Sequence, residues 1–257
     1  MMFEKKYNIT SLYLTDKTKR RSGLKINPQV KFVVAHDTGN PGSTARANVN
    51  YYENTNNSIY ASAHLFVDDV EILECIPALT TDKPEKAWHV RYNVEADNKM
   101  YGDEANDTAI GIEFCYGGGI NNLEAYKRYV WTIAYTCHKF GLDPKTSVVG
   151  HYLLDPGRRY DPLPGLRSVD KTYREFLSDV VKEYNICSTI SYPFRLIKIK
   201  SSGKIYALDR DKIKHHIFNL SSFEVGRQMG LWGGQDMLDL IESDNFKEGE
   251  SIIFVQP

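Results

Sequence analysis

Residues 31–36, KFVVAH, form an apolar run that ends in a histidine, which predicts a buried β-strand. Residues 108–115, TAIGIEFC, predict a second interior strand, in which the carboxylate of Glu113 stands among apolar neighbours. Residues 147–150, SVVG, predict a short third strand that delivers His151. Because segments of helical periodicity alternate with these strands, the sequence predicts an α/β domain whose mixed central β-sheet is flanked by helices.

The helices around this sheet are predicted from caps and from apolar spacing. Ser43 is expected to cap a helix over the residues that follow it, TARANVNYYEN. Apolar residues at helical spacing in residues 122–140 predict a long helix, which Gly141 terminates. Ser168 is expected to cap a further helix that continues through Tyr184.

The pattern changes near Cys187, where we expect a domain boundary between residues 1–187 and residues 188–257. FRLIKIK and KIYALD, on either side of a Ser-Ser-Gly turn, predict a β-hairpin, and KHHIF suggests another strand. Two short helical stretches are predicted near residues 223–229 and 236–241. The second domain is therefore expected to be a small C-terminal α+β unit.

The bulk composition excludes some classes of function. A net charge of −1 over 257 residues gives no basic surface for a polyanion, so nucleic acid is not an expected partner. No apolar run approaches the roughly 20 residues that span a bilayer, and the N-terminus lacks the apolar core of a secretory signal. The four cysteines form no CxxC pair, which favours buried free thiols in a protein made in a reducing cytoplasm.

Two separated segments carry residues suited to one metal site. VVAHDTGN contains His36, and GHYLLDPGRRYDP contains His151 and Asp161. Both histidines follow predicted strands, where site residues often gather in α/β folds. Two imidazoles and a carboxylate would leave one position of a tetrahedral zinc open for water. Each histidine alone fits a satisfied core or surface residue equally well, so the residues leave both interpretations open.

Glu113 and two arginines are candidates for the chemistry beside such a metal. A carboxyl group half-buried in a strand has a raised pKa, which suits a general base near neutral pH. A buried salt bridge with an arginine is the structural alternative for Glu113. Arg158 and Arg159 lie between His151 and Asp161, and one of them could stabilise an oxyanion or simply face solvent.

The remaining histidines receive other roles. His64, within a predicted strand, is expected to make structural hydrogen bonds, and His89, beside Trp88, is expected to contact substrate. As metal ligands, both would compete with His36 and His151. The other three histidines are expected to be non-catalytic: His138, His215 and His216.

Five motifs in this order resemble those of zinc-dependent N-acetylmuramoyl-L-alanine amidases, which are related to peptidoglycan recognition proteins: VVAHDTGN, SAHLFVDDVEILECIP, KAWHV, AIGIEFC and VVGHYLLDPGRRYDP. The resemblance covers about residues 28–180. It implies that Zn²⁺ is bound by His36, His151 and Asp161, that Glu113 is the catalytic glutamate, and that His89 lines the substrate groove. Arg159 stands where many members have a transition-state lysine, and its planar guanidinium reaches differently.

The resemblance also implies a substrate and a setting. The expected reaction is cleavage of the amide between N-acetylmuramic acid and L-alanine of bacterial peptidoglycan. The plan resembles a phage endolysin of a Gram-positive host, made in the host cytoplasm without a signal peptide and reaching the wall after membrane permeabilisation. The C-terminal domain would then bind a cell-wall polymer, with no membrane insertion; the alternatives are a dimerisation module and a purely structural module.

The same residues are also compatible with other functions. They are a non-catalytic peptidoglycan-binding module, a bacterial autolysin, a muropeptide-recycling amidase and a metallopeptidase that cuts within the stem peptide. The presence of both histidines together with Asp161 and Glu113 favours an enzyme over a binding module.

Overall fold

The structure is a computed structural model that describes residues 3–189, 193–209, 211–234, 238–242 and 244–254. Its contacts divide the chain into two compact units, Lys6–Ile186 and Cys187–Pro257 with Met1–Lys5. The break therefore falls beside the expected boundary, but the first residues group with the C-terminal unit. The reason is local, because the backbone N–H of Glu4 donates to the carbonyl of Cys187 at 3.0 Å.

The unit Lys6–Ile186 is built on a six-stranded sheet of order β1-β4-β3-β5-β2-β6. Only β3 and β4 pair antiparallel, so the sheet is mixed, as the sequence predicts. Its strands are β1 (Ile9–Ser11), β2 (Phe32–Asp37), β3 (Leu65–Val67), β4 (Ile72–Glu74), β5 (Ala109–Phe114) and β6 (Val148–Gly150). Residues far apart in the sequence thus become neighbours in β5, β2 and β6.

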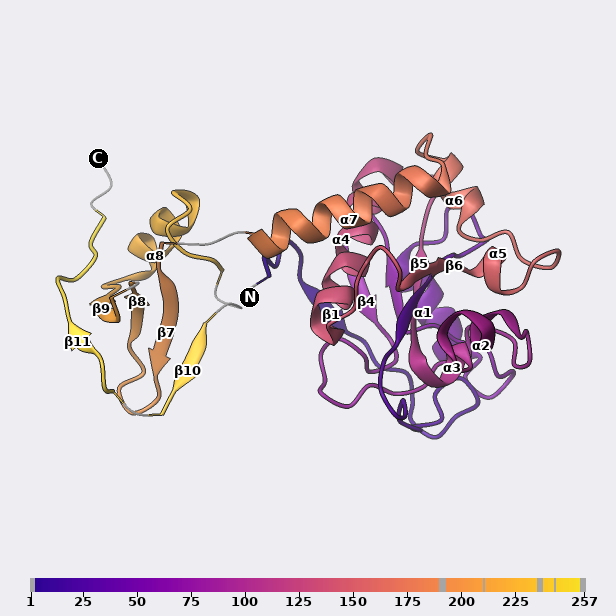
Figure 1. Ribbon diagram of the computed structural model, residues 1–257, viewed down its shortest axis with the longest axis horizontal. Coiled ribbons are helices and arrows are strands. Elements are labelled where there is room, and N and C mark those ends of the chain that lie inside the picture. The colour runs from indigo at the N-terminus through magenta and orange to yellow at the C-terminus, as the bar shows by residue number, and fades with distance from the viewer. Residues whose placement is uncertain (1–2, 190–192, 210, 235–237, 243, 255–257) are drawn as a thin grey trace. The chain divides into compact units, whose positions relative to one another are not determined.

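Helices flank this sheet (Figure 1): α1 (Ala45–Asn54), α2 (Ala96–Tyr101), α3 (Ala105–Thr108), α4 (Asn122–Phe140), α5 (His151–Leu154), α6 (Leu163–Arg167) and α7 (Tyr173–Thr189). α4 and α7 lie side by side, because the ring of Tyr129 stacks between those of Phe114 and Phe176. Phe114 follows Glu113 in the strand, so α4 covers the sheet face opposite to the glutamate.

The helix ends confirm one predicted boundary and correct two. Gly141 ends α4 in the left-handed conformation, as predicted. The cap of α1 is Thr44, whose side chain accepts from the N–H of Ala47, and not Ser43. Ser168 ends the short α6 instead of starting α7, because Pro162 and the residues after it already form a helical turn.

The sheet face that carries His36 is apolar below the histidine. Side chains alternate along β2, so Phe32 and Val34 share the face of His36. Both belong to a buried cluster with Ala109 of β5 and Val149 of β6. The same strands therefore contribute apolar side chains to the core at their beginnings and polar side chains to the site at their carboxyl ends.

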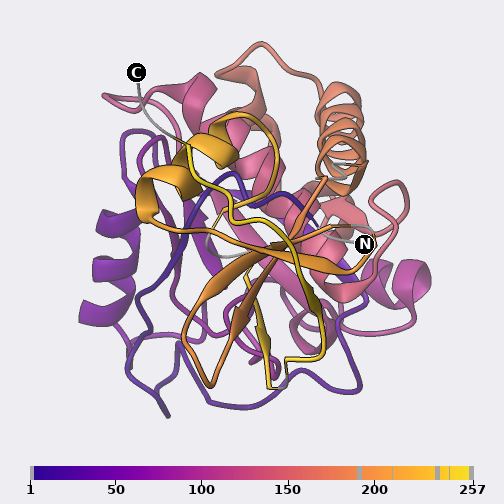
Figure 2. The ribbon, with the colours of Figure 1, turned by 90° about the vertical axis from the view of Figure 1, so that its left-hand side faces the viewer.

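The C-terminal unit holds a five-stranded sheet of order β10-β7-β8-β9-β11 and the helix α8 (Leu220–Gln228). Figure 2 shows this unit in orange to yellow, with α8 at one end of its strands. Its strands are β7 (Arg195–Ile199), β8 (Ile205–Leu208), β9 (Ile213–His216), β10 (Asp239–Ile241) and β11 (Lys247–Glu248). The predicted hairpin is confirmed by β7 and β8. The helix predicted at 236–241 is wrong where described, because Asp239–Ile241 pairs parallel with β7; residues 236 and 237 lie outside the described residues.

This small unit has its own hydrophobic core. Trp232 is fully buried against Phe223 of α8, and its indole N–H donates to the carbonyl of Phe223 at 2.9 Å. A second cluster, with Ile197 and Tyr206, lies on the opposite face of β7 and β8. Helix α8 and the sheet therefore form a packed body with apolar residues on both faces of its central strands.

The structure bears on two general predictions, which concern the cysteines and membrane-spanning segments. All four cysteines are buried free thiols, which confirms the prediction from their spacing. Within the described part of the chain, none of the helices combines the length and apolar character that crossing a membrane requires.

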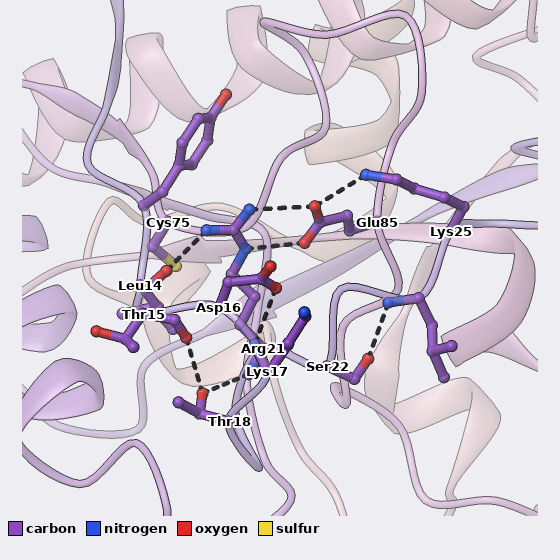
Figure 3. A network of polar contacts seen from close by, with 12 residues as sticks. Leu14, Thr15, Asp16, Lys17, Thr18, Arg21, Ser22, Lys25, Cys75 and Glu85 are labelled. Atoms are coloured by element: carbon purple, nitrogen blue, oxygen red, sulfur yellow. Dashed lines mark hydrogen bonds and ion pairs between the residues drawn. The ribbon is translucent and has the colours of Figure 1, made fainter.

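A buried ionic network fastens the N-terminal segment to the sheet (Figure 3). The guanidinium of Arg21 donates to both carboxylate oxygens of Glu85 at 2.8 and 3.1 Å and to the carbonyl of Leu14. Lys25 adds a second cation to Glu85 at 2.9 Å. The backbone carbonyl of Glu85 in turn accepts from His64, so the network reaches the strand that carries Glu113.

We expect Glu85→Gln to lower the free energy of unfolding by about 2 kcal/mol, because Arg21 loses a charged acceptor while mostly buried. Burial raises the pKa of Glu85, but the hydrogen bonds from Arg21 and Lys25 outweigh it and lower the pKa. The ionised group therefore adds stability above pH 4.5 that is lost as the pH falls through the lowered value. Urea unfolding between pH 7 and pH 3 checks this. The difference in the free energy of unfolding between wild type and Glu85→Gln should shrink at low pH. A difference that does not change with pH would contradict the stabilising role of ionised Glu85.

Candidate metal and catalytic site

Strand β2 brings His36 to the carboxyl edge of the sheet and holds it there. All six residues of β2 are buried, and His36 is only 2% exposed. The hydroxyl of Tyr129 donates to the backbone carbonyl of His36 at 2.9 Å. The carboxylate of the next residue, Asp37, accepts from the N–H of Gly165 at 2.8 Å. The end of β2 is thus fastened both to α4 and to the segment that follows Asp161.

Glu113 faces the same edge because β5 runs parallel to β2 with His36 and Glu113 in register. Paired residues on adjacent parallel strands point to the same face of a sheet. One carboxylate oxygen, Oε2, is buried without a hydrogen-bond partner in the described part of the chain. Burial, followed by the charges of Asp161 and Asp37, raises the pKa of Glu113 well above its ordinary value.

The structural alternative for Glu113 finds no support here. Over the residues that the structure describes, none of the ion pairs includes Glu113. Arg159 acts on it only as a nearby positive charge that works against the raised pKa. A buried carboxyl group with an unused oxygen and a raised pKa is a candidate for proton transfer.

His151 and Asp161 complete the group from the other side of β2. Strand β6 pairs with β2 up to Gly150, so His151, the next residue, lies beside His36. The Nδ1 atoms of His36 and His151 lie 2.8 and 3.0 Å from the same oxygen, Oδ2 of Asp161. The backbone carbonyl of Asp161 accepts from Tyr152 at 3.0 Å, which folds the long loop back onto His151.

These three side chains fit a divalent cation. One ligand atom of each lies within 4.8 Å of the others, and ligands on one tetrahedral zinc are about 3.3 Å apart. Burial lowers the pKa of His36 to about 4, so its imidazole is neutral at pH 7. Burial raises the pKa of Asp161, yet hydrogen bonds from His151 and His36 outweigh it and keep this carboxyl ionised. Neutral imidazole and ionised carboxylate are the forms that bind metals.

The other two buried histidines take different places. His64 uses both ring nitrogens within the fold, since Nδ1 accepts from the N–H of Gly111 at 2.9 Å and Nε2 donates to the carbonyl of Glu85 at 2.8 Å. The structural role predicted for it is therefore confirmed. His89 borders the cavity but is only 8% exposed, and its Nδ1 lies 3.1 Å from Nε2 of His36.

A cavity of about 400 Å³ opens over these residues. Arg158 and Arg159 both line it, and the guanidinium of Arg158 also forms an ion pair with Asp155. The lining combines the three candidate ligands and Glu113 with aromatic side chains that the sequence left without a role: Tyr52, Trp88 and Tyr160. Tyr160, directly before Asp161, lies within a quoted motif. Nothing in the sequence distinguishes Tyr52 from a helix residue that packs in a core.

Residues 26–164 match the family described as N-acetylmuramoyl-L-alanine amidase, which is more than half of the chain. The chain belongs to this family. The matched range contains every candidate ligand, Glu113 and Arg159, and it ends before α7.

Curated members of the amidase family show the same relationship. N-acetylmuramoyl-L-alanine amidase BlyA of Bacillus subtilis (strain 168) is 34% identical over 152 residues, which cover 56% of this chain and 39% of BlyA. CwlL of Bacillus licheniformis is 27% identical over 191 residues, which cover 72% of this chain and 50% of CwlL. The chain thus spans about half or less of the length of the curated amidases it matches.

Solved structures agree on the fold of this amidase-family chain. The catalytic domain of XlyA superposes with a TM-score of 0.53 at 23% identity, covering 67% of this chain and 99% of that domain. The Staphylococcus aureus hydrolase AmiA, solved in complex with its ligand, gives a TM-score of 0.52 at 22% identity, covering 71% and 85%. The mixed sheet flanked by helices is therefore the fold of these catalytic domains.

Proposed function

We propose that this chain hydrolyses the amide bond between N-acetylmuramic acid and L-alanine of bacterial peptidoglycan, with Zn²⁺ held by His36, His151 and Asp161. The observation that carries the proposal is the convergence of three ligand atoms beside Glu113, whose buried oxygen is without a hydrogen-bond partner in the described part of the chain. A metal with an open position and an adjacent proton acceptor are what amide hydrolysis by water requires.

Each side chain has a distinct role in this reaction. Zinc, when bound, supplies a Lewis acid that polarises the amide carbonyl and lowers the pKa of the attacking water. Glu113 takes the proton from that water and returns it to the leaving nitrogen of alanine. Its raised pKa suits a group that must both accept and release a proton near neutral pH. Arg159, on the cavity wall, stabilises the negative charge that develops on the carbonyl oxygen.

Arg159→Ala is expected to lower kcat on purified cell walls by about tenfold. This is less than the roughly 10²–10³-fold loss for a buried oxyanion donor, because Arg159 is exposed and solvent screens its charge. Arg159→Lys keeps the charge and should retain most of the activity. Arg158→Ala is the matched control, since Asp155 holds that guanidinium. Equal losses in the Arg158 and Arg159 variants would contradict a specific role for Arg159.

Mass spectrometry of purified walls digested by the protein tests the reaction itself. The proposal predicts intact stem peptides that begin with L-alanine, together with glycan strands that carry no new reducing ends. Cuts within the stem peptide would identify a metallopeptidase instead. Absence of any soluble product, with the protein bound to the walls, would identify a non-catalytic binding module.

We further propose that the C-terminal unit binds a cell-wall polymer and that the protein acts as a phage endolysin on a Gram-positive wall after the membrane is permeabilised. The separately packed unit supports this, because a second wall contact raises the effective concentration of an enzyme at its substrate. Co-sedimentation with walls should weaken at least tenfold when the chain ends at residue 189. Unchanged sedimentation, or loss of a dimer in its place, would contradict the wall-binding role.

A further inference from the structure

We propose that His89 is a positioning residue for the metal site, which holds His36 in the tautomer and orientation that bind the cation. This inference rests on the metal site of the proposed function. Nδ1 of His89 lies 3.1 Å from Nε2 of His36, and the two rings stand at 89° with their centroids 5.2 Å apart. This edge-on arrangement aims a nitrogen of one ring at a nitrogen of the other.

The direction of this hydrogen bond follows from the opposite side of His36. Its Nδ1 faces Oδ2 of Asp161 and is the ligand atom, so Nδ1 must carry no proton when a cation is bound. In a neutral imidazole the proton is then on Nε2, which donates to Nδ1 of His89. His89 must therefore accept with Nδ1 and carry its own proton on Nε2.

His89 itself is buried, so its ring is shielded from solvent. Nε2 of His89 is buried and has no hydrogen-bond partner among the described residues, so the contact with His36 is the one that its ring nitrogens make there. The order of groups is thus His89, His36 and the cation, in which the candidate metal ligand is held through its second ring nitrogen.

The fold also leaves space for the His89 ring and holds its backbone in place. The backbone N–H of His89 donates to Oδ1 of Asn106 at 2.9 Å. A Cβ atom at Gly111 would lie 2.7 Å from both Cγ and Nδ1 of His89, so only glycine at this point of β5 leaves room for the ring. Gly111 precedes Glu113 by two residues on the same strand face. The ring therefore lies where a side chain of β5 would otherwise be.

His36 and His151 differ in this respect. Nε2 of His151 is buried and has no hydrogen-bond partner among the described residues. The fold thus orients one imidazole ligand through His89 and the other through its contact with Asp161 alone. A role as a substrate contact, implied by the family resemblance, makes a different prediction, because it acts on KM and not on the metal.

The test is the zinc affinity of the full chain, measured by competition with a chromogenic chelator. His89→Ala removes the acceptor and should weaken zinc binding by about 10–100-fold. His89→Asn places an amide oxygen near the position of Nδ1, so it should restore most of that affinity. His216→Ala, in the C-terminal unit, is the histidine control and should bind as wild type does. Co²⁺ absorption spectra should change in the alanine variant and not in the asparagine variant.

Three results would overturn the proposal. Zinc affinity of His89→Ala within twofold of wild type, with a raised KM, would make His89 a substrate contact. Equal losses in the alanine and asparagine variants, with an equal fall in the Tm of the metal-free chain, would make the ring a packing element. A wild-type chain that binds no zinc would remove the metal site as well. Zinc binding without wall hydrolysis would sink only the proposed reaction, because the affinity measurement does not depend on turnover.

Discussion

Glu113→Gln is expected to lower the turnover of peptidoglycan by about 10²–10⁴-fold while zinc content stays unchanged. Glutamine has the shape of glutamate but cannot accept a proton from water. The metal is spared because the candidate ligand set consists of His36, His151 and Asp161 and does not include Glu113. Release of soluble peptides from purified walls measures the first effect, and metal analysis of the dialysed protein measures the second.

Glu124→Gln is the matched control for this prediction. Glu124 lies in the first turn of α4, where it pairs with Lys127 near the surface. The same chemical change there should leave turnover within about twofold, because surface substitutions rarely exceed 0.5 kcal/mol. Full activity in Glu113→Gln would remove this residue from the mechanism and would revive a structural explanation for the buried carboxyl group.

Asp161→Ala should abolish both stoichiometric zinc binding and activity. Oδ2 of Asp161 is the atom on which both Nδ1 atoms converge, so its loss leaves the two imidazoles without an anionic partner. Lewis-acid assistance amounts to several kcal/mol, and each 1.36 kcal/mol is tenfold in rate. We therefore expect turnover to fall by roughly 10³-fold or more, with a protein that remains folded by circular dichroism.

Asp161→Cys provides the rescue for this site. A thiolate is a good zinc ligand and, like the carboxylate it replaces, binds as an anion. We expect this variant to regain zinc and a measurable fraction of turnover. Stoichiometric zinc in Asp161→Ala, measured after dialysis, would show that the cation is held elsewhere.

The sequence predicted the strand ends well because burial leaves a strong local signal. The apolar runs before His36, Glu113 and His151 predict three strands, and the structure shows β2, β5 and β6 at these places. Their order and register depend on pairing between distant segments, which no local pattern encodes. That His36 stands opposite Glu113 is therefore a result of the structure alone.

Two elements of the fold were not predicted, for different physical reasons. β1 spans three mostly exposed residues, which are too few to show an alternating pattern. Asp239–Ile241 has a helix-compatible composition, yet its backbone pairs with the hairpin strand β7. The contact between His89 and His36 joins a loop to a strand, so the sequence singled out His89 as a substrate contact and did not predict its position beside His36.

The register between β2 and β5 determines where the chain can gain or lose residues during evolution. A single inserted residue within either strand would turn His36 or Glu113 to the opposite face, since successive side chains alternate. The segment between His151 and Asp161 is constrained differently, because it forms no strand but places Leu154 in the core and Arg159 on the cavity wall. Length variation among related proteins should therefore collect in loops that contribute no side chain to the site, while the spacing within the two strands stays invariant.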